Sequence, residues 1–516
     1  MSYNHALSVR SDFSVGESLL QIDHIVDRAK ALGYESVALV DMMSIHAMVD
    51  FSNKLRKTGI KPIIGCRIRV VDDPTYRPPK KGSGLEPQLN REYVIKAYAM
   101  NEQGIKGLLK LLSKANSHDY FYYVSRVGLA DVLALEGVIF STGDLFNVFH
   151  HPDHVDIVGR LAKVAPTYVE LCPIDTPLFD TLNAKALRAA KSLALPTLVT
   201  YPACYLDNGD ADSLDVLSAI ASNTQLSVSY RPIQQVKDFA FSGPKTLVGR
   251  AAKAQRRVAK WHGIDEPSLW AAGIGNAGRL AALCNYEFKK HPVSLPKLAE
   301  DEFRLLTEKC IEGWKRRFSS PVLGHQPSNA ELPAYRERLA YELRVLGSMG
   351  FAGYFLLAED LVSWAKQNGI IVGPGRGSVG GSLVAYLLGI TDVDPIRFNL
   401  MFERFINPER LDLPDADLDF MSSKRHLIVE YLVSKYGRDR VAGISNYSTL
   451  ASASALRDTG RIHGLSPLEL SASKLVPKEH GQPVSLGEAA RLVPELEKFK
   501  TEHPDIWAHA LKVEGV

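Results

Sequence analysis

The chain has 516 residues, of which 46% are hydrophobic and 23% charged, and its formal net charge is +3. This length predicts about two to four domains with sizeable cores, and the small net charge means that any nucleic-acid-binding surface must be local. No stretch approaches the roughly 18 apolar residues of a membrane span, and the polar N-terminus lacks the apolar core of a signal peptide. The five cysteines form no CxxC pair, which disfavours a zinc ribbon or a disulfide scaffold. We therefore expect a soluble, cytoplasmic, multidomain protein.

Strand-like and helix-like segments alternate over the first part of the chain. Helical patterns such as 24–34 and 103–116 lie between apolar runs that are typical of buried strands. These runs are at 36–42, 61–71, 92–100, 136–142, 167–173 and 195–202. Repeated strand-then-helix units predict an α/β layer or barrel with mostly parallel strands.

From about residue 205 the pattern becomes helical, and it stays largely helical through the tail after 447. Changes in pattern near 270–285 and 445 indicate domain boundaries. We therefore expect three domains, namely 1–270, 271–446 and 447–516.

A glycine-rich stretch, GPGRGSVGGS, follows the apolar run Ile-Ile-Val that ends at residue 372. A strand, a glycine loop and a helix in succession direct backbone N–H groups and a helix N-terminus toward one point, which suits a phosphate group. The stretch has neither the Gly-Lys-Ser/Thr ending of a Walker A loop nor the spacing of a dinucleotide-binding turn. A tight turn that needs positive φ angles would explain the glycines equally well.

Three acidic residues alternate in LPDADLDF, residues 413–420. In a strand, Asp415, Asp417 and Asp419 would leave the same face, and their mutual repulsion would raise their pKa values. Divalent cations would relieve the repulsion, because Mg²⁺ binds carboxylate oxygens together with substrate phosphates. Two such ions can activate an attacking oxygen and stabilise a leaving one. The alternative is a solvated acidic edge, but the flanking Leu418 and Phe420 indicate a strand half buried in a core.

Arg404 and Arg410 lie between the glycine-rich stretch and the acidic one. Arginines are usually solvated or paired with acids. A phosphate-binding loop, two arginines and a set of carboxylates within a short stretch are nevertheless what nucleotidyl transfer requires, because that chemistry depends on positioning and charge neutralisation.

Three long motifs follow one another along the chain: GPGRGSVGGSLVAYLLGITDVDP, LMFERFINPER and PDADLDF. They closely resemble the palm of the bacterial C-family replicative DNA polymerases, the DNA polymerase III alpha subunits. The following stretch, YGRDRVAGISNYSTLASASALRDTGRIHG, resembles the start of the thumb in that family. The resemblance implies an α/β multidomain fold, in which a PHP-like α/β barrel precedes a nucleotidyltransferase-type palm with a mixed sheet and a helical thumb.

The resemblance also implies roles for individual residues. Asp415 and Asp417 would be the catalytic acids that bind two Mg²⁺ ions, and Asp419 is the third acid of the motif, whose part in catalysis is left open. The incoming triphosphate would be held by the loop and the two arginines, namely Gly377, Ser378, Arg404 and Arg410. DNA phosphates would be contacted by Arg457 and Arg461.

The N-terminal third resembles the PHP domain of the family, with departures at the positions of its metal ligands. Ser8 and Arg10 stand where that family has a His-x-His, and Arg67 stands where it has a glutamate. Asp41-Met42 and residues 201–204 depart similarly. The resemblance therefore predicts a degenerate PHP-like domain without a metal, in which the two arginines could replace the charge of a cation. Its role would be structural, including docking of a proofreading exonuclease.

The last residues, ALKVEGV, resemble the point where the family's chain re-enters the palm. The third catalytic acid, the fingers and a clamp-binding segment of the family lie beyond that point. The resemblance thus implies template-directed DNA synthesis from dNTPs on primed DNA, active only together with a second, C-terminal polypeptide. A natural split polymerase, as a virus or mobile replicon would carry, and a truncated one both remain open, as do a bacterial cytoplasm and an infected host cell as its location.

Other readings stay open beside this one. The chain could be an inert docking or scaffold fragment of a replisome, or a nucleotide-binding regulator that uses the glycine loop. A metal-dependent phosphoesterase acting through the N-terminal domain is disfavoured by the missing His-x-His. Replacing Asp415 and Asp417 together separates catalysis from docking, because docking should survive.

Overall fold

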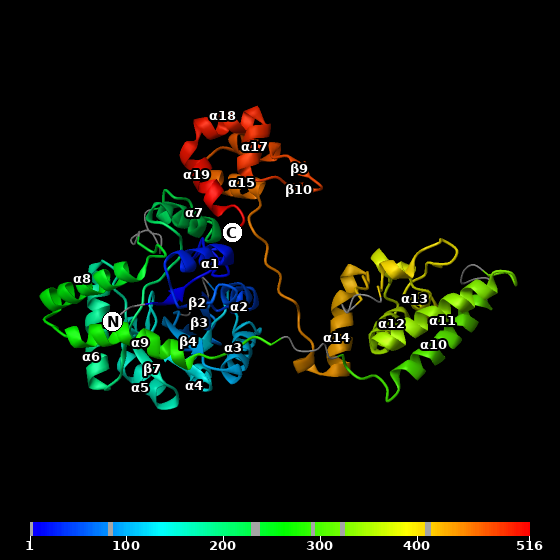
Figure 1. Ribbon diagram of the computed structural model, residues 1–516, viewed down its shortest axis with the longest axis horizontal. Helices are drawn as coiled ribbons and strands as arrows, with labels where there is room; N and C mark the ends of the chain where they lie inside the picture. The colour runs from blue at the N-terminus through cyan, green and yellow to red at the C-terminus, as the bar shows by residue number, and fades with distance from the viewer. Residues whose placement is uncertain (1–3, 81–85, 229–237, 290–294, 320–325, 408–413) are drawn as a thin grey trace. The chain divides into compact units, whose positions relative to one another are not determined.

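The computed structural model describes residues 4–80, 86–228, 238–289, 295–319, 326–407 and 414–516 (Figure 1). Contacts divide the chain into two compact units. One comprises Met1–Lys289 together with Tyr447–Val516 and is called the barrel–thumb unit below. The other comprises Lys290–Asn446 and is called the palm unit, after the domain that the resemblance predicts there.

The barrel–thumb unit is built on a sheet whose strands follow the order β1-β2-β3-β4-β6-β7-β8, with β5 paired to β3. Neighbouring strands are parallel except that β4 is antiparallel to β3 and β6. Each predicted apolar run is a strand or contains one, so the α/β prediction is confirmed. The strands are β1 (His5–Val9), β2 (Ser36–Met42), β3 (Lys61–Val71), β4 (Glu92–Ala99), β5 (Val127–Gly128), β6 (Val138–Ser141), β7 (Thr167–Leu171) and β8 (Thr197–Val199).

The sheet curls so that its first strand meets the segment after its last one. Val9 forms a parallel bridge with Ala203. The backbone N–H of Arg10 donates to the Ala203 carbonyl at 3.1 Å, and the Ala203 N–H donates to the Ser8 carbonyl at 3.0 Å. Because this curling brings the carboxyl ends of the parallel strands to one end of the barrel, polar residues at those ends become neighbours.

Helices surround the strands of the barrel (Figure 1). In α3, for example, Asn101 caps the first turn, and Ile105, Leu108 and Leu112 recur on one face and are buried. The helices are α1 (Ile22–Ala31), α2 (Met48–Arg56), α3 (Glu102–Ala115), α4 (Leu129–Leu133), α5 (His154–Val164), α6 (Pro177–Ser192), α7 (Ala211–Ala221), α8 (Pro244–His262) and α9 (Pro267–Leu283).

Helix α9 packs against the barrel rather than starting a second domain. The Asn276 side chain donates to the Thr197 carbonyl at 2.8 Å, and a Cβ at Gly273 would lie 3.0 Å from a methyl group of Val199. The boundary at 270 that the change of pattern predicts therefore falls inside this helix. The contacts of the chain divide it at Lys289 instead, because α9 covers β8.

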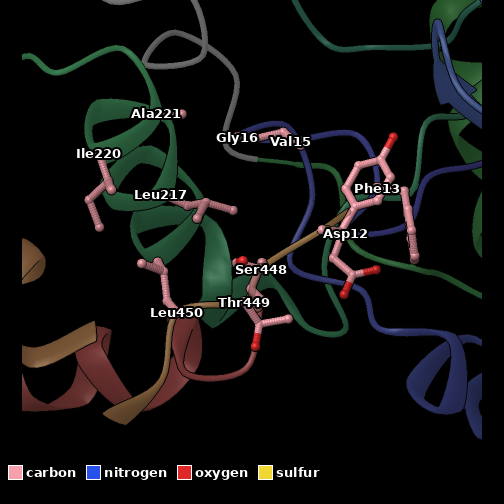
Figure 2. Close-up of a pocket in the computed structure, with 12 residues that line it drawn as sticks. Asp12, Phe13, Val15, Gly16, Leu217, Ile220, Ala221, Ser448, Thr449 and Leu450 are labelled. Atoms are coloured by element: carbon pink, nitrogen blue, oxygen red, sulfur yellow. The ribbon is translucent and has the colours of Figure 1, made fainter. Parts of the chain in front are cut away.

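Residues 447–516, the predicted thumb, share a hydrophobic core with the barrel through α7. The Leu226 N–H donates to the Ile462 carbonyl at 3.1 Å, and Trp507, 3% exposed, is part of that core. A pocket of about 350 Å³ lies at the junction, where Leu217 of α7 faces the loop that carries Phe13 (Figure 2). The elements are α15 (Ser452–Ile462), α16 (Pro467–Leu470), α17 (Leu486–Leu492), α18 (Pro494–Glu502), α19 (Pro504–Val513), β9 (Lys478–Glu479) and β10 (Gln482–Pro483).

The palm unit has a core of its own, which includes Leu306, Phe355 and Leu387. A Cβ at Gly313 would lie 2.1 Å from the Leu387 carbonyl oxygen, so α10 and α13 cross at a distance that only glycine permits. In the described part of this unit, the expected mixed sheet is represented by two isolated antiparallel bridges. The helices are α10 (Glu302–Phe318), α11 (Leu332–Met349), α12 (Ala352–Gln367), α13 (Leu383–Leu388) and α14 (Arg425–Tyr436).

Among the described residues, no single helix is both long and apolar enough to cross a membrane. Helices α11 and α12 pass such a test only as a pair bent by 112°. Both contribute buried side chains to the core of the palm unit, including Leu346 and Phe355.

Candidate active site

The acidic stretch of the palm unit pairs with the segment that leads into the glycine-rich loop. Two antiparallel bridges join them, between Val372 and Phe420 and between Arg376 and Asp417. The two bridges are four residues apart on the side that leads into the loop, but three residues apart on the acidic side. The extra residue forms a bulge in the Gly-Pro-Gly segment. The regular strand predicted for 413–420 is therefore wrong for its described residues, where glycine and proline interrupt the ladder.

One arginine holds two of the three aspartates. Arg376 Nη2 lies 3.0 Å from Asp417 Oδ1, and Arg376 Nε lies 3.4 Å from Asp419 Oδ2. The Arg376 side chain is 63% exposed, and those of Asp417 and Asp419 are 42% and 56% exposed. No role was predicted for Arg376 from the sequence. Its position between two glycines of the loop was the available signal.

The charges of Asp415 and Asp417 both affect the hydroxyl group of Tyr354. The backbone N–H of Ala416 donates to the Tyr354 hydroxyl at 3.0 Å, which anchors the acidic segment to α12. Burial raises the pKa of Tyr354, the hydrogen bond from Ala416 lowers it, and the charges of Asp415 and Asp417 raise it further. Both predicted catalytic carboxylates are thus close enough to Tyr354 for their charges to raise its pKa.

The glycine loop lies directly against Asp417. A Cβ at Gly377, where φ is +68°, would be 2.7 Å from Asp417 Oδ2, so a side chain here would displace the carboxylate. Beside this contact is a pocket of about 120 Å³. Gly377, Ser378 and Arg404 all line it, together with Asn399 and Met401. The structure thus brings together three of the residues predicted to bind the triphosphate.

The helix after the loop does not offer its N-terminus to a ligand, contrary to the prediction from the strand–loop–helix pattern. The buried carboxylate of Glu342 accepts hydrogen bonds from the N–H groups of Leu383 and Val384 at 2.9 and 3.0 Å, and from the Ser382 hydroxyl at 2.9 Å. Because Glu342 already satisfies these donors, any phosphate would have to bind the loop at 377–381 and not the end of α13.

Arg338 holds the glycine loop and the segment that carries Leu400 together with Glu342. It donates to Glu342 at 2.7 Å, to the Gly381 carbonyl at 2.7 Å and to the Leu400 carbonyl at 3.1 Å. It therefore ties α11 to two segments that line the pocket. Burial raises the pKa of Glu342, whereas the backbone hydrogen bonds and Arg338 lower it. Sequence reasoning missed this pair, because an arginine and a glutamate four residues apart on a helix are typical of a solvated surface pair.

The remaining predicted residues lie elsewhere. Arg410 lies outside the described residues. Arg457 and Arg461 are both on α15 of the barrel–thumb unit. Arg461 donates to the Asn223 side chain at 2.7 Å, and Arg457 lies 3.4 Å from Asp458.

The donor set of the acidic segment fits a hard divalent cation. Asp415 is exposed and Asp417 partly exposed, so both carboxylates are accessible from solvent, and that of Asp417 lies against Gly377 of the loop. Mg²⁺ needs only one or two carboxylates when substrate phosphates and water complete its shell. In the described part of the chain, no group of three or more His, Cys, Asp or Glu side chains is arranged to hold a metal ion by itself.

A second polar cluster fills the carboxyl end of the barrel. Asp144 is fully buried and accepts hydrogen bonds from Ser8 at 2.5 Å and Arg10 at 2.9 Å. Lys96 Nζ is also 2.9 Å from its carboxylate, and Arg67 Nε is 3.7 Å away. Although burial raises the pKa of Asp144, Lys96, Arg10 and Arg67 hold it well below its usual range.

Two further acids balance these cations. Lys96 pairs with the buried Glu170 at 2.6 Å, and Arg67 pairs with Glu17 at 2.5 Å. The positive charge at this end of the barrel therefore comes from two arginines and a lysine whose side chains are at most 2% exposed. That Arg10 and Arg67 replace the charge of a cation stays a prediction.

Asp41, near the end of β2, has hydroxyl and backbone N–H groups as its hydrogen-bond partners instead of cations. It accepts hydrogen bonds from the backbone and hydroxyl of Ser11 and from the Ser14 hydroxyl, each at 2.7 Å. Burial raises the pKa of Asp41 to about 6, although these hydrogen bonds lower it. Among the described residues, no ion pair involves this carboxylate.

Comparison with known proteins agrees with both parts of the structure. Residues 6–171 match the PHP domain, and residues 304–516 match the bacterial DNA polymerase III alpha NTPase domain. These matches describe a multidomain protein in which a PHP domain is followed by a region similar to the bacterial DNA polymerase III alpha NTPase domain.

Relatives match over nearly the whole chain. The DNA polymerase III subunit alpha of Yersinia pestis is 36% identical over 524 residues, a match that covers 99% of this chain and 44% of the relative. Those of Aquifex aeolicus and Escherichia coli K12 are 31% and 30% identical, covering 97% and 99% of this chain and 44% and 43% of theirs. The chain is thus similar over almost its whole length to bacterial DNA polymerase III alpha subunits, and it spans less than half the length of these relatives.

Proposed function

We propose that the chain carries out template-directed DNA synthesis by nucleotidyl transfer, as the N-terminal part of a C-family replicative DNA polymerase. The observation that carries the proposal is the contact between Asp417 and Gly377, because it sets a carboxylate beside a pocket lined by Ser378 and Arg404. A metal-binding acid next to a phosphate-binding loop is the arrangement that phosphoryl transfer needs.

In this proposal each residue has one task. Asp415 and Asp417 hold divalent cations. Bound Mg²⁺ would lower the pKa of the primer 3′-hydroxyl and neutralise charge on the phosphates. The N–H groups of Gly377 and Ser378 and the Arg404 guanidinium orient the triphosphate. Arg338 and Glu342 act indirectly, because they fix the loop and the segment that carries Leu400.

The same proposal includes partners. A second, C-terminal polypeptide is a proposed partner, which would supply the third catalytic acid and the fingers. Primed DNA and dNTPs are the substrates, and Arg410, Arg457 and Arg461 would contact phosphates. A sliding clamp and a proofreading exonuclease are further candidate partners, and the bacterial cytoplasm or an infected cell is the proposed location.

A second candidate is an inert docking fragment of a replisome. The ion pairs of Arg376 with Asp417 and Asp419 favour it, because they neutralise the acids without any metal. The buried charge cluster of the barrel is equally compatible with docking, since it stabilises the domain without requiring catalysis.

Primer extension distinguishes the two. The chain would be incubated with primed DNA, Mg²⁺ and four dNTPs, alone and with the polypeptide encoded immediately downstream. We expect extension only in the mixture, its loss in Asp417→Ala, and its retention in Asp439→Ala, which removes an exposed aspartate of the same unit. Stable association of the two polypeptides without extension would favour the docking fragment.

A further inference from the structure

The guanidinium of Arg376 forms ion pairs with two carboxylates of the acidic segment. It reaches Asp417 Oδ1 at 3.0 Å and Asp419 Oδ2 at 3.4 Å, and so joins two carboxylates that would otherwise repel each other. Arg376 forms part of the backbone bridge to Asp417 as well, so its side chain starts directly opposite that residue.

The two oxygens of Asp417 have different surroundings. Oδ2 lies against Gly377, where even a Cβ would be within 2.7 Å. Oδ1 faces the Arg376 side chain. A cation that approaches Asp417 from solvent therefore meets Oδ1 and the guanidinium together, and two positive charges cannot share that oxygen at contact distance without strong repulsion.

The ion pairs of Arg376 are suited to exchange. All three side chains are more than 40% exposed, and exposed ion pairs add little to stability. A divalent cation can therefore displace the arginine at small cost. The buried pairs around Asp144 are not comparable, because displacing them would leave a charge in the barrel interior without a partner.

Displacement would also change the neighbouring pocket. Gly377, Ser378 and Arg404 line it, and Arg376 precedes Gly377 in the chain but does not line it in this structure. Once released from Asp417, its guanidinium would be available to phosphate oxygens bound at the loop.

We propose that Arg376 is a positioning residue that acts as an exchangeable counter-ion. It holds Asp417 and Asp419 before a divalent cation binds, and the cation displaces it. The inference rests on the proposed function, because it assumes that Asp417 is a metal ligand. It goes beyond that function by assigning to Arg376 a competition with the metal.

Mn²⁺ binding to the full chain, followed by electron paramagnetic resonance of the free ion, tests this proposal without any need for activity. We expect Arg376→Ala to bind Mn²⁺ roughly three- to tenfold more tightly than the unchanged chain, because two exposed ion pairs no longer compete. Arg376→Lys should give a smaller gain. Arg336→Ala, which removes an exposed arginine on α11, is the matched control and should leave the affinity unchanged.

An equal gain in Arg336→Ala would overturn the proposal, because general electrostatics would then explain the effect. An unchanged or weaker affinity in Arg376→Ala would also overturn it. Adding Asp417→Ala to Arg376→Ala should abolish the gain. If Mn²⁺ binding is insensitive to Asp415→Ala and Asp417→Ala in the unchanged background, the metal site of the proposed function fails instead, which is a distinguishable result.

Discussion

The carboxyl end of the barrel and the acidic segment of the palm unit both combine aspartates with arginines, but they differ in burial. Asp144 and its cationic partners are at most 2% exposed, whereas Arg376, Asp417 and Asp419 are all more than 40% exposed. In the barrel, permanent side-chain cations balance the acids. At the palm, a single exposed arginine does so, and water reaches every member.

This difference shows that burial decides whether an ion pair is a structural element or an exchangeable one. A buried pair cannot lose one member without leaving a desolvated charge. An exposed pair loses little when water or another ion replaces a partner. The same residue types thus give a closed cluster in one region and an accessible one in the other.

The largest expected effect is on the barrel. Asp144→Asn leaves Arg10, Arg67 and Lys96 with too little negative charge, and we expect the free energy of unfolding to fall by about 3–5 kcal/mol. Urea unfolding followed by circular dichroism measures it. The matched substitution Asp417→Asn should change it by less than about 1 kcal/mol. If both variants unfold at the same urea concentration, the contrast between the regions is wrong.

Glu342 tests whether burial, rather than location in one unit or the other, causes the contrast. It belongs to the palm unit but is fully buried. Glu342→Gln weakens its hydrogen bonds to α13 and its pair with Arg338, and we expect a loss of about 2 kcal/mol. Glu337→Gln on the exposed face of the same helix is the control and should cost less than about 0.5 kcal/mol. Thermal unfolding of both variants provides the comparison.

We expect the stability of the barrel to depend on pH through Asp41. Because burial raises its folded pKa to about 6 from 3.8, the folded state binds a proton more tightly, so stability from this group increases as pH falls from 7 toward 5. The lowered pKa of Asp144 contributes equally across that range. We expect a gain of about 1 kcal/mol between pH 7 and pH 5 that is absent in Asp41→Asn.

Melting temperatures of the unchanged chain and of Asp41→Asn at the two pH values measure this difference. Asp50→Asn, on the exposed side of α2, should follow the unchanged chain. A pH response that is identical in all three proteins would show that Asp41 is already neutral or already well solvated in the folded state.

The smallest effect is expected at Arg376. Arg376→Ala should lower the free energy of unfolding by at most about 0.5 kcal/mol at low salt. The difference should vanish in 1 M NaCl, because the Debye length there is only roughly 3 Å and exposed charges are strongly screened. Urea unfolding at the two salt concentrations checks it. A loss that persists at high salt would mean that Arg376 supports the fold and is not freely exchangeable.

Local patterns in the sequence determined much of this protein. The apolar run at 36–42 is β2 and the run at 61–71 is β3, because a buried strand requires a continuous run of apolar residues. Gly377, Ser378 and Arg404 could be placed together, since they lie in neighbouring motifs and line one pocket. The family also followed from these motifs.

Only the tertiary structure decided which charges meet. Asp144, Lys96 and Glu170 are isolated in sequence and become neighbours because the sheet curls and closes, so no local pattern could indicate them. Glu342 was indistinguishable from a surface glutamate until α11 packed on α13 and buried it. The pairing of Arg376 with Asp417 depends on a bulge between segments 41 residues apart. Periodicity describes one segment at a time, whereas burial and ion pairing depend on which segments the fold brings into contact.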